Sequence, residues 1–134
     1  MREEELAAAA ADVIRAVENT LGDERGRWLL EPHAQARSEY ALSLLRDGRL
    51  ETGVIDRSFV DADGTRWIVD YKTSRHSGTD VEAFLEQERL RYAPQLERYA
   101  SLMRGLGAPR VKVALYFPLM QRFLSWEPDH GPEP

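Results

Sequence analysis

Apolar residues recur at helical spacing near the start of the chain. The stripe consists of Leu6, Ala9, Ala10, Val13, Ile14 and Val17. Residues three and four apart share one face of a helix, so the pattern predicts an amphipathic helix over residues 3–20, within an N-terminal segment 1–22 that ends near Gly22. We expect this stripe to face the core or an interface.

The next part of the chain alternates between apolar and polar residues, as strands do. Residues 23–37 are expected to be irregular or partly helical, and strands are predicted over 38–46, 50–60 and 66–71. The pair Asp47-Gly48 and the run Asp61-Ala62-Asp63-Gly64 are turn signals between them. Three strands joined by short turns predict an antiparallel meander.

The second half returns to helical spacing and then to strands. Helical residues run from about 80 to 106, and we expect Pro94 to divide them, with the main helix beginning near 91–93. Strands follow over 111–117 and 121–126, and residues 127–134 are predicted to form a flexible tail. This order predicts an α/β fold, a mixed central sheet flanked by helices, in a single domain over 1–126.

Composition supports a globular protein. The chain has 134 residues, 43% of them apolar and 31% charged. No apolar run approaches the ~20 residues that a membrane-spanning helix needs. The start, Met1-Arg2-Glu3-Glu4-Glu5, is acidic where a secretory signal is basic, so we expect a cytoplasmic protein with no membrane partner.

The inventory of metal-binding side chains is narrow. There is no cysteine, which excludes an iron–sulfur cluster held by this chain, and there are three histidines. Oxygen ligands, and therefore Mg²⁺ or Mn²⁺, are the expected choice. No phosphate-binding loop of the P-loop type is present, so no nucleotide cofactor is expected. The net charge of −5 counts against a stand-alone nucleic-acid binder, but less against a catalytic domain.

Candidate chemistry lies at the ends of two predicted strands. Asp56 ends one apolar run, and Asp70 and Lys72 end the next. Side chains two apart on a strand point to the same face, so Asp70 and Lys72 share a side that Asp56 reaches from the neighbouring strand. Two carboxylates and an ammonium suit a divalent cation and phosphodiester hydrolysis. The alternative for both Asp56 and Asp70 is a surface turn acid, or an ion pair with Arg57 or Lys72.

Three motifs follow one another along the chain: Gly53-Val54-Ile55-Asp56-Arg57, Asp70-Tyr71-Lys72-Thr73 and Tyr92-Ala93-Pro94-Gln95-Leu96-Glu97-Arg98-Tyr99. In this order they resemble the PD-(D/E)xK nuclease superfamily, and within it the RecB-like nuclease domain of AddA-type helicase–nucleases. The resemblance covers about residues 28–126. It implies a restriction-endonuclease-like core and a Mg²⁺- or Mn²⁺-dependent deoxyribonuclease, possessing exonuclease activity, that works in double-strand-break repair and recombination.

The resemblance also implies roles for individual residues. Asp56, Asp70 and Lys72 would be catalytic, with Asp56, Asp70 and the backbone carbonyl of Tyr71 as metal ligands. Glu39 is a candidate accessory acid, and a solvated glutamate is the alternative. The residues expected to bind or support the substrate are Arg57, Thr73, Tyr92, Gln95 and Tyr99. Arg75 and His76 are further candidates for phosphate contacts, with a solvated loop as the default.

The family's upstream helix carries a metal-binding histidine, which the helix over 3–20 lacks, and His33 is expected at the surface. Either the chain is a fragment of a larger protein, weakly active or inactive in isolation, or that ligand has been replaced. The implied partners are single-stranded DNA or a duplex end, and a helicase motor on the same or a partner polypeptide. A Cas4-like enzyme is disfavoured because cysteine is absent. The alternative function is a catalytically inactive nuclease fold used for DNA binding or scaffolding.

Overall fold

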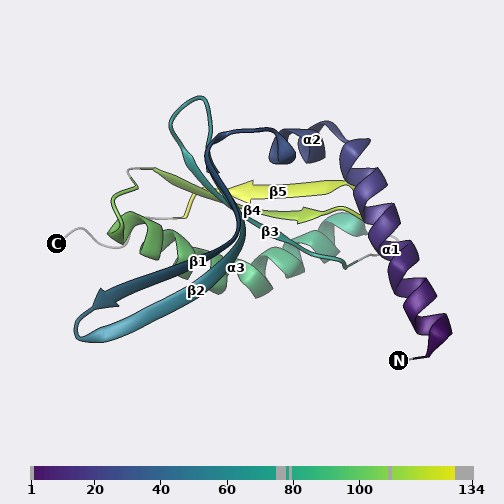
Figure 1. Cartoon of the computed structure of the whole chain (residues 1–134), viewed down its shortest axis with the longest axis horizontal. Coiled ribbons are helices and arrows are strands. Elements are labelled where there is room, and N and C mark those ends of the chain that lie inside the picture. The colour runs from purple at the N-terminus through teal and green to yellow at the C-terminus, as the bar shows by residue number, and fades with distance from the viewer. Residues whose placement is uncertain (1, 75–77, 79, 109, 129–134) are drawn as a thin grey trace.

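The computed structural model describes residues 2–74, 78, 80–108 and 110–128. Eight elements follow one another along the chain (Figure 1): α1 Glu3–Leu21, α2 Glu24–Leu30, β1 Ala34–Arg46, β2 Arg49–Val60, β3 Arg66–Tyr71, α3 Val81–Gly105, β4 Val111–Phe117 and β5 Arg122–Trp126. The strands form one sheet in the order β1-β2-β3-β4-β5. The predicted α/β fold, a mixed sheet flanked by helices, is confirmed.

The antiparallel meander of the first three strands is also confirmed, since β1 pairs with β2 and β2 with β3 in that sense. The β1–β2 turn consists of Asp47 (φ 51°) and Gly48 (φ 75°), the left-handed pair that a tight hairpin requires. β4 returns through α3 to lie parallel to β3, and β5 is antiparallel to β4. The crossover therefore makes β3 a central strand.

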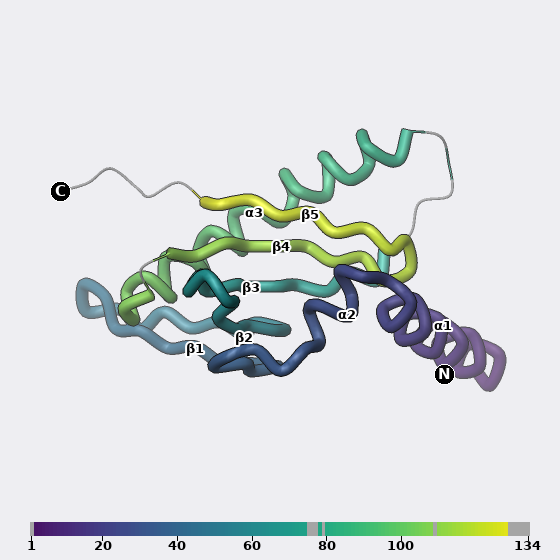
Figure 2. The backbone as a smooth tube through the Cα atoms, turned by 90° about the horizontal axis from the view of Figure 1, so that it is seen from above, coloured from purple at the N-terminus to yellow at the C-terminus, as the bar shows by residue number. Residues whose placement is uncertain are grey.

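The sheet has a hydrophobic cluster on each face. On one face α3 covers a cluster that includes Ile55, Ile68, Leu96 and Leu115. On the other, Leu29 of α2 packs into a cluster with Phe59, Val69 and Tyr116. Figure 2 shows α3 along one side of the sheet. Because β3 is covered on both faces, a charged side chain at its end loses contact with water. This costs free energy unless a partner compensates the charge.

The β1–β2 hairpin continues beyond the rest of the sheet as a bent arm (Figure 1). Only residues 57–60 of β2 pair with β3, whereas the β1–β2 ladder reaches to the hairpin turn. Asp56 thus lies at the point where β2 parts from β3. The arm packs on α3: a Cβ added to Gly53 would be 2.4 Å from Cε1 of Tyr99.

Two expectations about the elements were wrong in detail. β1 begins at Ala34 rather than residue 38, and its pairing with β2 has a register irregularity between Ala34 and Arg37. Pro94 lies inside α3 and does not divide it. The carbonyl that Pro94 leaves without a donor belongs to Leu90, which is 59% exposed, so water can satisfy it, while Ala93 and Leu96 hold the helix on the sheet.

The helical prediction over 3–20 is confirmed as α1. None of its described residues is buried, so the apolar stripe does not belong to the core, and an interface role stays a prediction. None of the described helices is both long and apolar enough to cross a bilayer. Of the predicted flexible tail, residues 129–134 lie outside the described part, while the carbonyl of Pro128 accepts a hydrogen bond from Arg104.

Candidate active site

The two predicted acids meet where β2 and β3 separate. The β2–β3 ladder ends with Arg57 opposite Val69, and one step further along the two strands are Asp56 and Asp70. Oδ2 of Asp56 accepts a hydrogen bond of 2.9 Å from the backbone N–H of Tyr71. This bond fixes the Asp56 carboxylate against β3, beside Asp70, as the alternation of the two strands predicts.

Lys72 completes the cluster from the same strand. Its Nζ is 2.7 Å from Oδ2 of Asp70, and the side chains of Lys72 and Asp70 are only 18% and 17% exposed. The backbone N–H of Lys72 donates to the carbonyl of Tyr116 at 2.9 Å, which extends the β3–β4 ladder to this residue. The backbone at the end of β3 is therefore bonded to Asp56 on one side and to β4 on the other. These bonds fix the position from which the Lys72 side chain extends.

Burial of Asp70 and its hydrogen bond with Asp56 raise the pKa of Asp70 to about 6, against the opposing effect of Lys72. Repulsion from the Asp56 charge adds to the shift. Lys72 alone therefore does not compensate the two carboxylates. Additional positive charge would stabilise them, which is the electrostatic condition that favours a bound cation.

The helix α3 supplies a third side of the cluster through Tyr92. Nζ of Lys72 lies 3.7 Å from the centroid of the Tyr92 ring, within the range of a cation–π interaction. Among the described side chains, the Lys72 ammonium contacts the ring of Tyr92 and not the ring of Tyr99. Nε2 of Gln95 instead donates to the hydroxyl of Tyr99 at 3.0 Å, and the Tyr99 ring is buried beneath the arm.

The remaining candidates lie elsewhere. The Arg57 guanidinium donates to the carbonyls of Leu29 at 2.9 Å and Glu31 at 3.1 Å, so it joins β2 to the end of α2. The ring of Tyr71 lies against Tyr116, with centroids 6.4 Å apart. Substrate contacts of Arg57 and a metal-binding carbonyl at Tyr71 stay predictions.

Five further polar residues were considered from the sequence, and they lie as follows. Glu39 is exposed and has a left-handed φ of 50°. Thr73 is exposed, and Arg75 and His76 lie outside the described residues. His33 is not a free surface residue: its ring stacks on Phe59 at 4.1 Å, and its Nε2 is 2.5 Å from the carbonyl oxygen of Trp28. It therefore belongs to the packing between α2 and the sheet.

One buried acid was not predicted from the sequence. Glu88 is 7% exposed on α3, one helical turn before Tyr92, and lines a cavity of about 180 Å³ with Phe84, Gln87 and Arg91. Its spacing of three from Leu85 and four from Tyr92 was the available signal, because it puts Glu88 on the sheet-facing side of the helix.

The described residues offer a two-carboxylate site. Nowhere in ranges 2–74, 80–108 and 110–128 do three side chains of the His, Cys, Asp and Glu types come together as a metal site. Asp56 and Asp70 are nevertheless a donor set that fits a hard divalent cation, since such ions can retain several waters and bind through one or two carboxylates. The raised pKa of Asp70 is the observation that supports this fit.

Comparison with known proteins places the chain in a family. Residues 2–129 match the model described as the PD-(D/E)XK nuclease superfamily. No curated protein matches. A solved structure titled "Crystal structure of SSO0001" is 18% identical with a TM-score of 0.44, and the match covers 92% of this chain and 54% of that one. The chain thus spans about half the length of that structure.

Because the family model covers nearly the whole sequence, the chain belongs to the PD-(D/E)XK nuclease superfamily. Membership implies nuclease activity and DNA binding in general, and nucleases of this superfamily generally use divalent metal ions. Asp56, Asp70 and Lys72 lie together in the structure, and their catalytic and metal-binding roles stay predictions.

Proposed function

We propose that this member of the superfamily is the nuclease domain of a RecB-like, AddA-type helicase–nuclease that hydrolyses DNA with Mg²⁺ or Mn²⁺. The observation that carries the proposal is the contact of Asp56, Asp70 and Lys72 at the end of β3. The same proposal includes exonuclease action on single-stranded DNA or a duplex end, a helicase motor as partner, a cytoplasmic location and a role in break repair. These parts of the proposal rest on the sequence motifs.

Each residue has a physical role in this proposal. Asp56 and Asp70 would hold the cation, and the backbone N–H of Tyr71 keeps the Asp56 carboxylate oriented. A bound divalent cation supplies Lewis-acid stabilisation of the scissile phosphate. Lys72 would stabilise negative charge that develops on the phosphate, because its half-buried ammonium acts where water screens it weakly.

The test is cleavage of single-stranded DNA in the presence of Mn²⁺ by the wild type, Lys72→Ala and Asp70→Asn. The matched controls are Lys112→Ala, which removes the chain's other lysine, and Asp63→Asn, an exposed turn acid. We expect loss of cleavage by about 10²-fold or more for the site variants, little change for the controls, and no cleavage with a chelator. Equal rates in all five proteins would disprove the assignment.

One observation favours a second candidate, a catalytically inactive DNA-binding or scaffolding module. The described residues provide only two of the acids that a fully protein-ligated site would use. DNA binding without cleavage, unchanged by Mn²⁺, by Lys72→Ala and by a longer polypeptide that includes neighbouring sequence, would support this candidate. Cleavage that appears only in the longer polypeptide would support the helicase–nuclease.

A further inference from the structure

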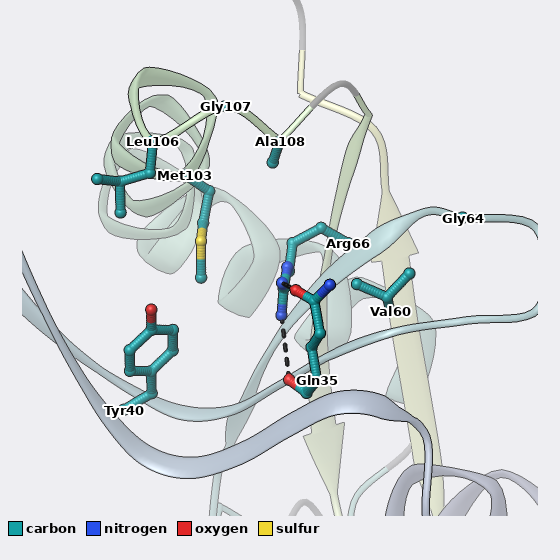
Figure 3. Close-up of a pocket in the computed structure, with 9 residues that line it drawn as sticks. All are labelled: Gln35, Tyr40, Val60, Gly64, Arg66, Met103, Leu106, Gly107 and Ala108. Atoms are coloured by element: carbon teal, nitrogen blue, oxygen red, sulfur yellow. Dashed lines mark hydrogen bonds between the residues drawn. The ribbon is translucent and has the colours of Figure 1, made fainter.

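A cavity of about 420 Å³ lies away from the carboxylates, between the C-terminal end of α3 and strands β1 to β3 (Figure 3). Its volume lies within the ~300–1,000 Å³ typical of small-molecule sites. Tyr40, Met103 and Leu106 form apolar walls, and Gln35 and Arg66 are its polar side chains. No acidic residue is among those that the described chain contributes to the lining.

The Arg66 guanidinium is only partly committed to the protein. Its Nη1 donates to the backbone carbonyl of Gln35 at 3.2 Å and to Oγ of Ser58 at 3.4 Å. Its Nη2 donates to the side-chain oxygen of Gln35, which reaches it inside the cavity (Figure 3). Within the described residues Nε has no recorded acceptor. The Nε–Nη2 edge, which binds phosphate in bidentate geometry, is therefore covered only by a movable amide.

The charge around Arg66 is unbalanced. Burial lowers the pKa of Arg66, and repulsion from Arg37 lowers it further, against an opposing effect of Tyr40. The Arg37 guanidinium carbon is 5.2 Å from the Tyr40 ring centroid. In the described ranges neither arginine has a carboxylate within ion-pair distance. The two neighbouring guanidiniums therefore give this cavity a local positive charge, in a chain whose net charge is −5.

One residue that lines the cavity has a strained backbone, and two glycines there have empty space beside them. Gln35 has a φ of 50°, a left-handed conformation that costs free energy for a residue with a side chain, and such outliers gather at functional sites. At Gly64 and Gly107, on the lining, an added Cβ would meet no atom within 4 Å. Open space therefore lies beside both glycines.

We propose that this cavity binds a nucleotide, with the phosphate on the Nε–Nη2 edge of Arg66 and the base against Tyr40 and Met103. The Gln35 amide gives way to the phosphate. The choice of a nucleotide among anions rests on the proposed nuclease function. Arg66 and Asp70 share a face of β3 but are four residues, ~13 Å, apart, so the two sites are separate.

The test is calorimetric titration of the metal-free protein, with chelator present, with thymidine 5′-monophosphate, thymidine, inorganic phosphate and an oligothymidylate. We expect the monophosphate to bind at least tenfold more tightly than thymidine, and Arg66→Gln to weaken it at least tenfold. Arg110→Gln is the matched control, because Arg110 is exposed, pairs with Glu127 and does not line the cavity. Its affinity should equal that of the wild type.

A second variant separates binding from folding. Gln35→Asn tolerates the left-handed backbone but shortens the amide, so it frees the Arg66 edge. We expect tighter monophosphate binding by Gln35→Asn, whereas a purely structural Arg66 predicts no change. Binding of the oligothymidylate alone, lost in Arg66→Gln, would identify the DNA strand as the source of the nucleotide.

Three results would overturn the proposal: no binding of either nucleotide ligand, equal binding of thymidine, or unchanged binding by Arg66→Gln. Asp70→Asn should bind the monophosphate as the wild type does. Retained nucleotide binding, with DNA cleavage that fails even in the longer polypeptide, would therefore refute the proposed nuclease function and leave this site standing. DNA cleavage without nucleotide binding would overturn this site and leave the nuclease function standing.

Discussion

The ammonium of Lys72 lies between two partners of different chemistry: Oδ2 of Asp70 at 2.7 Å and the face of the Tyr92 ring at 3.7 Å from its centroid. The first partner is a candidate metal ligand and the second is not. If a cation takes the Asp70 oxygens, the ring remains to hold the ammonium. Tyr92 is thus expected to act as a positioning residue for Lys72.

We predict that Tyr92→Leu lowers kcat for DNA cleavage by about 3- to 30-fold, the value of a half-buried cation–π contact. Tyr92→Phe keeps the ring face and should remain within about twofold of the wild type. Steady-state kinetics with the two variants measure this, and KM should change little because Lys72 acts on the developing charge. Equal loss in both variants would assign the effect to the hydroxyl instead.

The raised pKa of Asp70 predicts that the free energy of unfolding depends on pH. Its pKa of about 6 in the folded protein exceeds the ordinary value near 3.8, so between these pH values the folded state retains a proton that the unfolded chain has released. Stability conferred by this group therefore falls as the pH rises through that window. We expect Asp70→Asn to melt above the wild type at pH 8 and the difference to shrink towards pH 4.

Thermal melts of both proteins across this range provide the measurement, with Asp63→Asn as an exposed control whose difference from the wild type should be nearly constant. A difference between Asp70→Asn and the wild type that grows as the pH falls would contradict the assignment of raised pKa to Asp70.

A divalent cation should stabilise the fold through the two carboxylates. At Mn²⁺ concentrations near 100 times the dissociation constant, the expected gain is about 2–3 kcal/mol. The melting temperature of the wild type should rise on adding Mn²⁺ and fall back with chelator. Asp56→Asn and Asp70→Asn should lose most of this rise. A rise of equal size in both variants would place the ion elsewhere.

Gly53 tests how the arm is held on α3. A Cβ there would be 2.4 Å from Cε1 of Tyr99, closer than real Cβ contacts, so Gly53→Ala should reduce the free energy of unfolding by about 1–3 kcal/mol. Urea denaturation measures it. In a Tyr99→Leu background the same substitution should cost clearly less, because the ring that it meets is gone. Additive losses would show that the two residues do not interact.

Much of the site could be predicted because strand periodicity is local. Asp70 and Lys72 are two apart on one strand, which places them on one face whatever the rest of the chain does. The turn signals at Asp47-Gly48 and Asp61–Gly64 bounded β2 closely, and the strand predicted over 66–71 is confirmed. These features need only near neighbours in sequence.

Other features escaped because they depend on distant packing. Local propensity places a break at Pro94, but burial of Ala93 and Leu96 on the sheet keeps α3 continuous. The sequence motif named Tyr92, Gln95 and Tyr99 alike. Among them Tyr92 contacts Lys72, since the rotation of α3 on the sheet selects which face meets β3. Arg57, adjacent to Asp56, points to the opposite cluster and holds α2.

The strand ends that carry Asp56, Asp70 and Lys72 follow from the order of residues alone, because side-chain alternation and turn chemistry are properties of short segments. The contact of the two carboxylates, the cover of Tyr92 over the ammonium and the position of Arg66 at a cavity arise only when the chain folds. The reason is that these relations depend on the β2–β3 register and on the seating of α3, which long-range burial sets.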